Sequence, residues 1–201
     1  MSLVGKKALN FKAKAVMQDD YINESFDLSD YTRGFKCLLF FYPLDFTFVC
    51  PSEIIAFSSK TDEFEKRNAK VVGVSVDSHF SHIAWRNTPY EKGGIQKVRF
   101  PLVSDITKNI SKSYQVLIEE EGIALRGAFI IDEEFTVRHM LVNDLPLGRN
   151  VDEFLRVMDA MDHHQKHGEV CPAGWNKGEE AMKPSSEGVA KYIGNVSRYK
   201  N

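Results

Sequence analysis

The distribution of apolar residues along the chain predicts a set of buried strands. The run from Cys37 to Tyr42 is apolar without interruption, which is typical of a strand covered on both faces. Further β-branched or aromatic runs predict strands at 69–76, 100–103, 126–131 and 135–142. The last two flank the polar segment Asp132-Glu133-Glu134, which indicates a hairpin.

Helical spacing fills the intervals between these strands. Apolar residues after Pro51 recur on one stripe with charges opposite, and similar patterns predict helices at 78–86, 106–114 and 152–164. Gly168 follows the last of them, at a position where glycine commonly ends a helix. Because helices alternate with strands, we expect an α/β protein whose mixed central sheet is flanked by helices on both faces.

The helical and strand patterns fail after residue 167. Prolines and glycines interrupt a polar tail of about thirty residues. We therefore predict a core domain at 1–167 and an extended C-terminal arm at 168–201. Trp175, Tyr192 and Ile193 are apolar groups within the arm, and we expect them to dock on a neighbouring surface.

Composition and charge narrow the classes of function. The chain has 201 residues, 43% hydrophobic and 27% charged, which suits one globular domain with an arm. The formal net charge of −2 provides no basic field, so we expect neither nucleic acid nor membrane as a partner. No apolar run approaches the roughly 20 residues that cross a bilayer, and the first residues lack the apolar stretch of a secretory signal. We expect a soluble, cytoplasmic protein.

Three cysteines are too few for a disulfide scaffold, and no Cys-x-x-Cys pair offers a zinc site. Cys37 lies within the apolar strand, so we expect a structural role. Cys171 lies in a turn-rich segment, where we expect an exposed thiol that is competent for exchange. His163, His164 and His167 cluster at a helix end, and we interpret them as solvated side chains rather than as a metal site.

Cys50 occupies the junction between the buried strand and the next helix. Pro51 suits the first helical position, and Glu53 suits the third position of a capping box. Cys50 is then the helix cap, and its sulfur lies near unpaired N–H groups and the positive end of the helix dipole, which favour a thiolate. The thiolate is nucleophilic, so the pattern predicts a reactive cysteine. Spacing alone leaves open the alternative of a small buried apolar residue.

Neighbouring residues and two distant arginines complete a predicted pocket around Cys50. Thr47 can place its hydroxyl beside the sulfur as donor and acceptor, and Pro43 can shield the site from water. Arg126 begins an otherwise apolar strand, and a buried arginine needs an anionic partner. Arg126 is therefore the best candidate for a cation in the pocket, with Arg149 as the second.

Two long segments resemble motifs of a known family. Residues 40–53 (Phe-Phe-Tyr-Pro-Leu-Asp-Phe-Thr-Phe-Val-Cys-Pro-Ser-Glu) closely resemble the active-site motif of the typical two-cysteine peroxiredoxins. Residues 167–175 (His-Gly-Glu-Val-Cys-Pro-Ala-Gly-Trp) are similar to the resolving-cysteine motif of these enzymes, and shorter matches occur at 76–79, 84–85, 87–89 and 143–146. The resemblance covers nearly the whole chain.

The resemblance implies a thioredoxin-like fold and the reduction of hydrogen peroxide, organic hydroperoxides and peroxynitrite, with no cofactor and no metal. It implies that Cys50 attacks the peroxide and becomes a sulfenic acid. Thr47 and Arg126 would hold the peroxide oxygens, and Pro43 would close the pocket. Cys171 from the partner chain of a homodimer would then form a disulfide with Cys50.

The same resemblance assigns supporting roles and partners. Glu53 and Arg149 would orient Arg126. Trp85 is not assigned by the resemblance: a tryptophan at such a position is more often a core residue, and we expect it also to wall the active site or the dimer face. Thioredoxin or a dedicated flavoprotein reductase would recycle the disulfide, within antioxidant defence and redox homeostasis, and the dimers would assemble as a ring of five. A holdase chaperone activity, which the family also shows, and a redox relay to a partner protein are the alternative functions.

Disulfide formation would require the turn that carries Cys50 to unwind, so we expect local unfolding over 48–54. The chain departs from the family pattern where this motion is regulated. Easily over-oxidised members carry Gly-Gly-Leu-Gly and a Tyr-Phe pair, whereas this chain has Gly-Gly-Ile-Gln ending at Gln96 and Tyr-Ile ending at Ile193. We expect weaker packing of the C-terminal segment, fast disulfide formation and moderate resistance to over-oxidation.

Overall fold

The computed structural model describes residues 2–195, which divide into two compact units. The first unit extends to Val151, and the second begins at Asp152. The last predicted helix thus clusters with the C-terminal segment, whereas the sequence suggested a boundary between residues 167 and 168. That boundary lies at the end of a helix within the second unit and stays a prediction.

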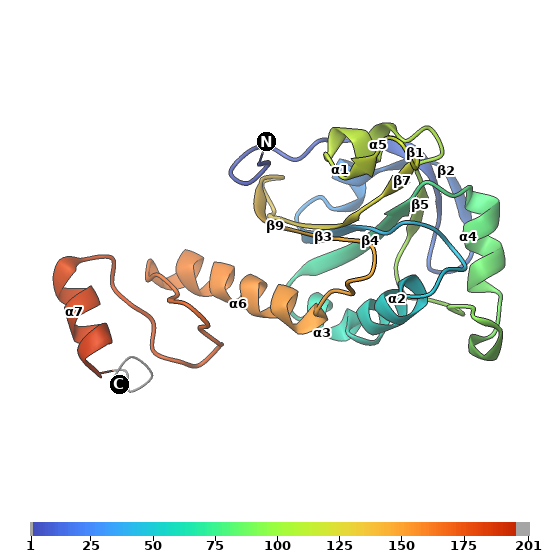
Figure 1. Cartoon of the computed structure of the whole chain (residues 1–201). Helices are drawn as coiled ribbons and strands as arrows, with labels where there is room; N and C mark the ends of the chain where they lie inside the picture. The colour runs from blue at the N-terminus through green and yellow to red at the C-terminus, as the bar shows by residue number, and fades with distance from the viewer. Residues whose placement is uncertain (1, 196–201) are drawn as a thin grey trace. The chain divides into compact units, whose positions relative to one another are not determined.

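A seven-stranded mixed sheet forms the centre of the first unit (Figure 1), in the order β2-β1-β5-β4-β3-β8-β9. Strands β3, β4 and β5 pair in parallel, and the other pairings are antiparallel. The strands of this sheet are β1 (Lys12–Val16), β2 (Ile22–Asp27), β3 (Lys36–Phe41), β4 (Ala69–Ser75), β5 (Leu102–Ser104), β8 (Arg126–Ile131) and β9 (Val137–Asn143). A second, two-stranded sheet consists of β6 (Leu117–Ile118) and β7 (Ile123–Ala124).

Helices connect most of these strands. The helices of the first unit are α1 (Leu28–Tyr31), α2 (Cys50–Ser59), α3 (Thr61–Glu65), α4 (His79–Arg86), the 3-10 helix η1 (Tyr90–Lys92) and α5 (Asn109–Ser113). Helix α6 (Val151–His167) and helix α7 (Ser186–Asn195) belong to the C-terminal part of the chain. No helix within residues 2–195 is long and apolar enough to cross a membrane.

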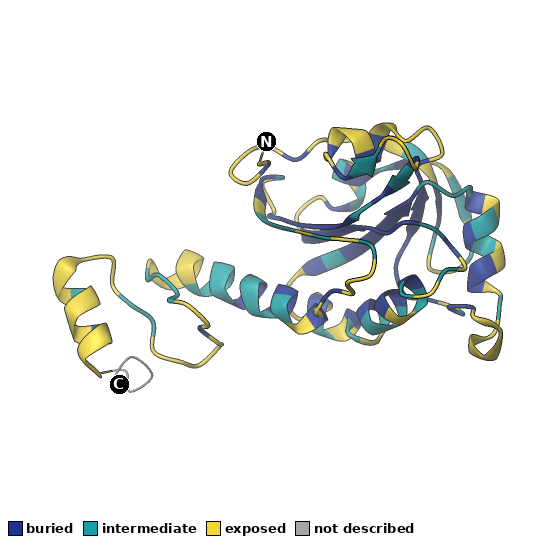
Figure 2. Cartoon of the chain, in the orientation of Figure 1, coloured by how far each residue is buried: buried dark blue, intermediate teal, exposed yellow. Residues whose placement is uncertain are grey.

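Strand β3 shows why the sheet is covered on both faces. Its side chains alternate between the faces, as in any strand, yet all six of its residues are buried (Figure 2). Phe41 packs in a core cluster that also holds Leu28 of α1 and Ile110 of α5. Phe40 points to the other face, where its ring stacks on Phe57 of α2 with centroids 4.5 Å apart. The predicted two-sided burial is confirmed.

The predicted central strands and the late hairpin are confirmed, one predicted helix start needs correction, and one hairpin was not predicted. The helix predicted at 106–114 begins only at Asn109, after Lys108 in a left-handed backbone conformation. The hairpin of β1 and β2 was not predicted, because β1 mixes lysines with small apolar residues and its register shifts between Ala13 and Ala15.

The second unit confirms the long helix and its glycine stop. Gly168 has a left-handed φ of 67° and donates its N–H to His164 O, which ends α6. The segment beyond it is not devoid of structure, since Val170 pairs with Met182 and helix α7 follows. Trp175 does not need a neighbouring molecule for burial: it is 1% exposed, and its ring packs on His163 of α6.

Candidate active site around Cys50

Cys50 is the first residue of α2, directly after the loop that leaves the carboxyl end of β3. The predicted capping arrangement is wrong. Val49 is the N-cap, with helical backbone angles and no capping side chain, and Pro51 follows Cys50 within the first turn. Glu53 does not reach back to the cap, because its carboxylate is taken up by two arginines. Helix α2 therefore begins at Cys50 itself, and no side chain caps its first turn.

Thr47 places its hydroxyl beside the sulfur, as the sequence predicted. Thr47 Oγ1 lies 3.0 Å from Cys50 Sγ and 2.9 Å from the carbonyl oxygen of Leu44. A hydroxyl has a single hydrogen, so it donates to one of these two acceptors at a time. The hydroxyl can therefore donate to a thiolate, or accept a bond from a thiol while it donates to Leu44.

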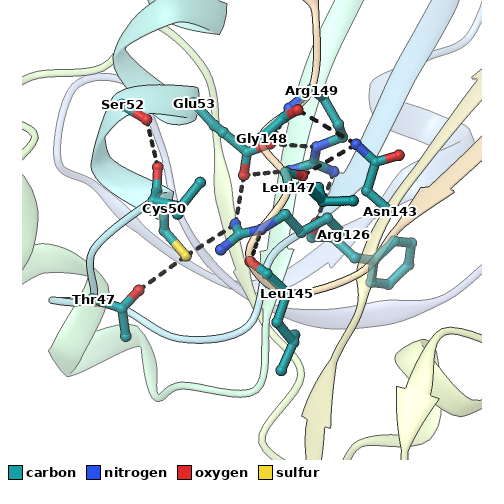
Figure 3. A network of polar contacts seen from close by, with 12 residues as sticks. Thr47, Cys50, Ser52, Glu53, Arg126, Asn143, Leu145, Leu147, Gly148 and Arg149 are labelled. Carbon is teal, nitrogen blue, oxygen red and sulfur yellow. Dashed lines mark hydrogen bonds and ion pairs between the residues drawn. The ribbon is translucent and has the colours of Figure 1, made fainter.

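Arg126 approaches the same sulfur from the first position of β8. Its Nη1 lies 3.4 Å from Cys50 Sγ and donates to Glu53 Oε2 at 2.6 Å (Figure 3). Its Nε donates to the carbonyl of Leu145 at 2.7 Å. Among the described residues, no acceptor is bonded to the remaining nitrogen, Nη2. This nitrogen is free to donate to a small ligand.

Arg149 completes the ion-pair network from the far side of Glu53. Its backbone N–H and its Nε donate to Glu53 Oε1, at 2.9 and 2.7 Å. Its Nη1 donates to the carbonyls of Phe41 and Gly127, and its guanidinium lies over the ring of Phe40. Burial lowers the pKa of Arg149, while the hydrogen bond and the charge of Glu53 oppose that shift.

The charges of the three buried side chains beside Cys50 do not balance one another. Arg126, Glu53 and Arg149 have side chains at most 4% exposed. Two guanidiniums and one carboxylate leave one positive charge uncompensated, and buried charges are costly unless they are paired. Cys50, whose side chain has no exposed surface, lies beside this cluster, and a negative charge there would make the cluster neutral. Any oxidant reaches the sulfur only when the residues that cover it shift.

Two further predicted residues frame the loop rather than the sulfur. Pro43 is buried at the start of the loop. Trp85 of α4 is fully buried, donates its indole N–H to Gly93 O, and packs its ring 5.7 Å from that of Phe46. Phe48, on the same loop, is 98% exposed. Trp85 thus supports the base of the loop, and the expected wall next to the sulfur stays a prediction.

A buried polar network that was not predicted from the sequence lies beneath this loop. Asp45 accepts from Tyr42 Oη at 2.9 Å and lies 2.8 Å from His82 Nδ1. Its backbone N–H donates to Asp77, and burial raises the pKa of the Asp77 carboxyl, with the charge of Asp45 adding to the shift. Two features of the sequence could have indicated this network: a carboxylate within an apolar loop, and a histidine on the apolar face of α4.

The other two cysteines differ sharply from each other. Cys37 is fully buried in β3, and burial raises the pKa of its thiol. Cys171 is partly exposed in the second unit, with Sγ 3.6 Å from Ala160 O. Desolvation raises the pKa of Cys171 and the charge of Arg156 opposes the shift. The structural prediction for Cys37 fits its burial.

The histidines at the end of α6 are engaged with the segment that carries Cys171. His163 Nε2 lies 2.9 Å from Glu169 Oε2, and His164 Nδ1 lies 2.7 Å from the Glu169 carbonyl. Within residues 2–195, no cluster of histidine, cysteine and acidic side chains has the arrangement of a metal site.

Comparisons with known proteins agree with this geometry. The AhpC/TSA family model matches residues 4–140, and the model for the C-terminal domain of 1-Cys peroxiredoxin matches residues 160–195. The chain is 56% identical to alkyl hydroperoxide reductase C of Helicobacter pylori, over 95% of this chain and 96% of that protein. It is 53% identical to peroxiredoxin-1 of Gallus gallus, with 96% of each chain covered.

A solved structure also superposes closely on this one. The crystal structure of the reduced 2-Cys peroxiredoxin of Plasmodium vivax has a TM-score of 0.93 and 51% identity, over 96% of this chain and 100% of the other. Its close match agrees with the predicted thioredoxin-like fold. The two donors beside Cys50 and this match over 96% of the chain lead to one conclusion: the chain belongs to the AhpC/TSA family, as a typical two-cysteine peroxiredoxin.

Proposed function

We propose that this chain is a thiol-dependent peroxidase and that Cys50 is the residue that reacts with the peroxide. The Cys50 thiolate attacks one peroxide oxygen, an S–O bond forms as the O–O bond breaks, and hydroxide or alkoxide leaves and takes up a proton. Thr47 and the free Nη2 of Arg126 donate to the peroxide oxygens as charge moves onto the leaving oxygen. Pro43 limits the access of water.

Cys171 completes the cycle in this proposal. Its thiolate, from the partner subunit, attacks the sulfenic sulfur of Cys50; a disulfide forms and water leaves. Two electrons from thioredoxin, or from a dedicated flavoprotein reductase, return both cysteines to thiols. Cys171 is partly exposed and free, which suits this exchange better than the buried Cys37.

One observation carries the proposal: two donors from distant parts of the chain converge on a single sulfur. Thr47 Oγ1 and Arg126 Nη1 lie 3.0 and 3.4 Å from Cys50 Sγ. A structural cysteine needs neither donor, since a thiol buried among apolar groups is already satisfied.

The test is a non-reducing gel and a peroxide-consumption assay on the purified protein. After stoichiometric peroxide, we expect wild type to run as a disulfide-linked dimer, and Cys50→Ser and Cys171→Ser to run as monomers. Cys50→Ser should also abolish peroxide consumption, whereas Cys37→Ser, the matched control, should behave as wild type. Full turnover by Cys50→Ser would overturn the proposal.

We also propose that the chain works as a homodimer, that five dimers form a ring and that the enzyme acts in the cytoplasm. The exposed side chains of Phe80 and Ile106, 66% and 62% accessible, support a further contact between subunits. Light scattering coupled to gel filtration measures the mass of the assembly, and Phe80→Asp should shift it from the ring to dimers. A ring that survives this change would reject that contact. The holdase and relay alternatives stay predictions.

A further inference from the structure

We propose that Asn143 is a positioning residue for the reaction of Cys50 with peroxide. It fixes the turn at 144–148, and through that turn it fixes the guanidinium of Arg126. The inference rests on the role proposed above for Cys50 and Arg126, and it assigns a function to a side chain that does not touch the sulfur.

The orientation of the Arg126 guanidinium depends on two anchors. Nη1 is held by Glu53, and Nε is held by the carbonyl of Leu145. A planar group held at one nitrogen can rotate about that bond, whereas two hydrogen bonds fix its plane. Without the Leu145 carbonyl, Nη2 has no fixed direction and the donor geometry at the peroxide is lost.

The Leu145 carbonyl lies on a turn that packing alone does not hold. Leu145 belongs to the connection between β9 and α6, and Leu147 on the same turn is 57% exposed. One backbone hydrogen bond crosses the turn, from Leu147 N–H to Asp144 O at 3.1 Å. The shape of the turn therefore depends on side-chain hydrogen bonds.

Asn143 supplies those bonds from the last position of β9. Its Nδ2 donates to the carbonyl of Leu147 at 3.1 Å and to that of Gly148 at 3.4 Å (Figure 3). The amide NH₂ group has two hydrogens for these two acceptors. Asn143 is also the register partner of Arg126 across the β8–β9 ladder. The backbone of Asn143 thus sets the start of the turn beside Arg126, and its side chain closes the turn.

The same turn leads directly into the rest of the network. Gly148 precedes Arg149, and a Cβ placed on Gly148 would lie 3.5 Å from Val49 and 3.9 Å from Glu53. The turn therefore lies against the start of α2, so a displacement at 147–148 is transmitted to both arginines. Asn143 therefore acts on the reaction through the contact between this turn and the start of α2, and not through a hydrogen bond of its own to Cys50 or to Arg126.

The test compares two reactions of the same sulfur in Asn143→Asp. Aspartate has nearly the shape of asparagine but places acceptors against two carbonyls. We expect the rate constant for Cys50 oxidation by hydrogen peroxide, measured by stopped flow, to fall roughly 5- to 10-fold, as for the loss of one or two hydrogen bonds. Alkylation of Cys50 by iodoacetamide does not use Arg126 to hold a peroxide, so its rate should stay within about twofold.

Asn68→Asp is the matched control. Asn68 Nδ2 donates to Gly34 O near the amino end of β3, remote in the sheet from the loop that carries Cys50. This substitution makes the same chemical change and should leave both rates as in wild type. Should Asn143→Asp lose its cooperative thermal transition, Asn143→Ala, which adds no charge, provides the same comparison.

A double-mutant cycle with Arg126→Lys decides whether the effect passes through Arg126. Lysine lacks the Nε that Leu145 holds, so Asn143→Asp should lower the peroxide rate by less than twofold in that background. The inference is overturned if Asn143→Asp lowers the peroxide rate equally in both backgrounds. It is also overturned if Asn143→Asp lowers the alkylation rate as much as the peroxide rate, or changes neither rate. Failure of the proposed function is separate, because it would appear as turnover by Cys50→Ser.

Discussion

The carboxylate of Glu53 and the guanidinium of Arg126 are joined at 2.6 Å through the same nitrogen that lies 3.4 Å from Cys50 Sγ. Glu53 therefore competes with the sulfur for the positive charge of Arg126 while it holds that charge in place. A variant that loses the carboxylate would hold Arg126 less firmly and would also leave more positive charge facing Cys50. These two effects change the reactivity of Cys50 in opposite directions.

Glu53→Gln separates the two effects. We expect oxidation of Cys50 by peroxide to slow, because Arg126 loses an anchor, and alkylation of Cys50 to stay the same or quicken, because the sulfur faces more positive charge. Loss of one partner from a buried ion pair costs about 3–5 kcal/mol, so the melting temperature should fall as well. Glu63→Gln, which weakens a surface pair with Lys66 and a half-buried pair with Arg67, is the control and should change stability by under about 1 kcal/mol. Parallel losses in both reactions of Glu53→Gln would contradict the orienting role.

Thr47 offers a test of the hydroxyl itself. Thr47→Val keeps the shape of the side chain but removes the hydrogen bond to Cys50 Sγ. A hydrogen bond to a charged group contributes about 1.5–3 kcal/mol, so the peroxide rate constant should fall roughly 10- to 100-fold. Thr47→Ser retains the hydroxyl and should stay within a few-fold of wild type in stopped-flow oxidation. Equal rates for Ser and Val variants would exclude the hydroxyl from the reaction.

The first turn of α2 should open when the disulfide forms. Val49 provides no side-chain cap, and the bond from Glu53 N–H to Val49 O is long, at 3.3 Å. Because the Glu53 side chain is tied to both arginines, the expected opening narrows from 48–54 to 48–52. Hydrogen exchange by mass spectrometry should show faster exchange there in the disulfide form than in the reduced form. Peptides from β3 are the internal reference, and equal protection of 48–52 in both forms would count against the opening.

Resistance to over-oxidation should depend on two departures from the family pattern. Gln96 adopts a left-handed φ of 50°, which favours glycine, and Ile193 of α7 is 46% exposed. We expect wild type to form mostly disulfide in millimolar peroxide, and Gln96→Gly/Ile193→Phe to accumulate more sulfinic acid. Intact mass spectrometry distinguishes the two products. Rapid conversion of wild type to sulfinic acid would reject this expectation.

Cys37 and Cys171 should react in a fixed order with an alkylating reagent. Desolvation raises the pKa of both thiols, so each has a reduced thiolate fraction at neutral pH, and the fraction grows as pH rises. Cys171 is accessible, so its labelling should accelerate steadily toward alkaline pH, whereas buried Cys37 should stay unlabelled until the protein unfolds. Peptide mapping after timed labelling measures both, and early labelling of Cys37 would contradict its burial.

The sequence predicted those parts of the fold that depend on local pattern. The uninterrupted apolar run of β3 and the hairpin around Asp132 are strong signals, because burial on both faces and a tight polar turn leave little choice of conformation. Residue types around Cys50 also indicated a nucleophile beside Thr47. Arg126 was identified because a cation at the start of an apolar strand is costly without a partner.

The parts that failed depend on contacts between distant segments. Glu53 fits a capping box when only its neighbours are considered, yet β8 pairs with β3 and brings Arg126 to the helix start, where an ion pair outcompetes a cap. The Tyr42–Asp45–His82 network was missed for the same reason, since it joins the loop after β3 to His82 of α4, 37 residues from Asp45. Contacts between distant segments leave no periodic pattern in the sequence from which they could be predicted.

The attachment of Glu53 to Arg149, and of Arg149 to the carbonyls of Phe41 and Gly127, limits how far the reactive sulfur can travel. Cys50 precedes Glu53 by three residues, and an extended chain of that length spans about 10 Å. In the proposed cycle, the oxidised sulfur would therefore swing out only within that radius, while the two guanidiniums remain on the sheet. A subunit in the proposed disulfide form would then keep both guanidiniums in place around an empty pocket, to which the sulfur returns on reduction.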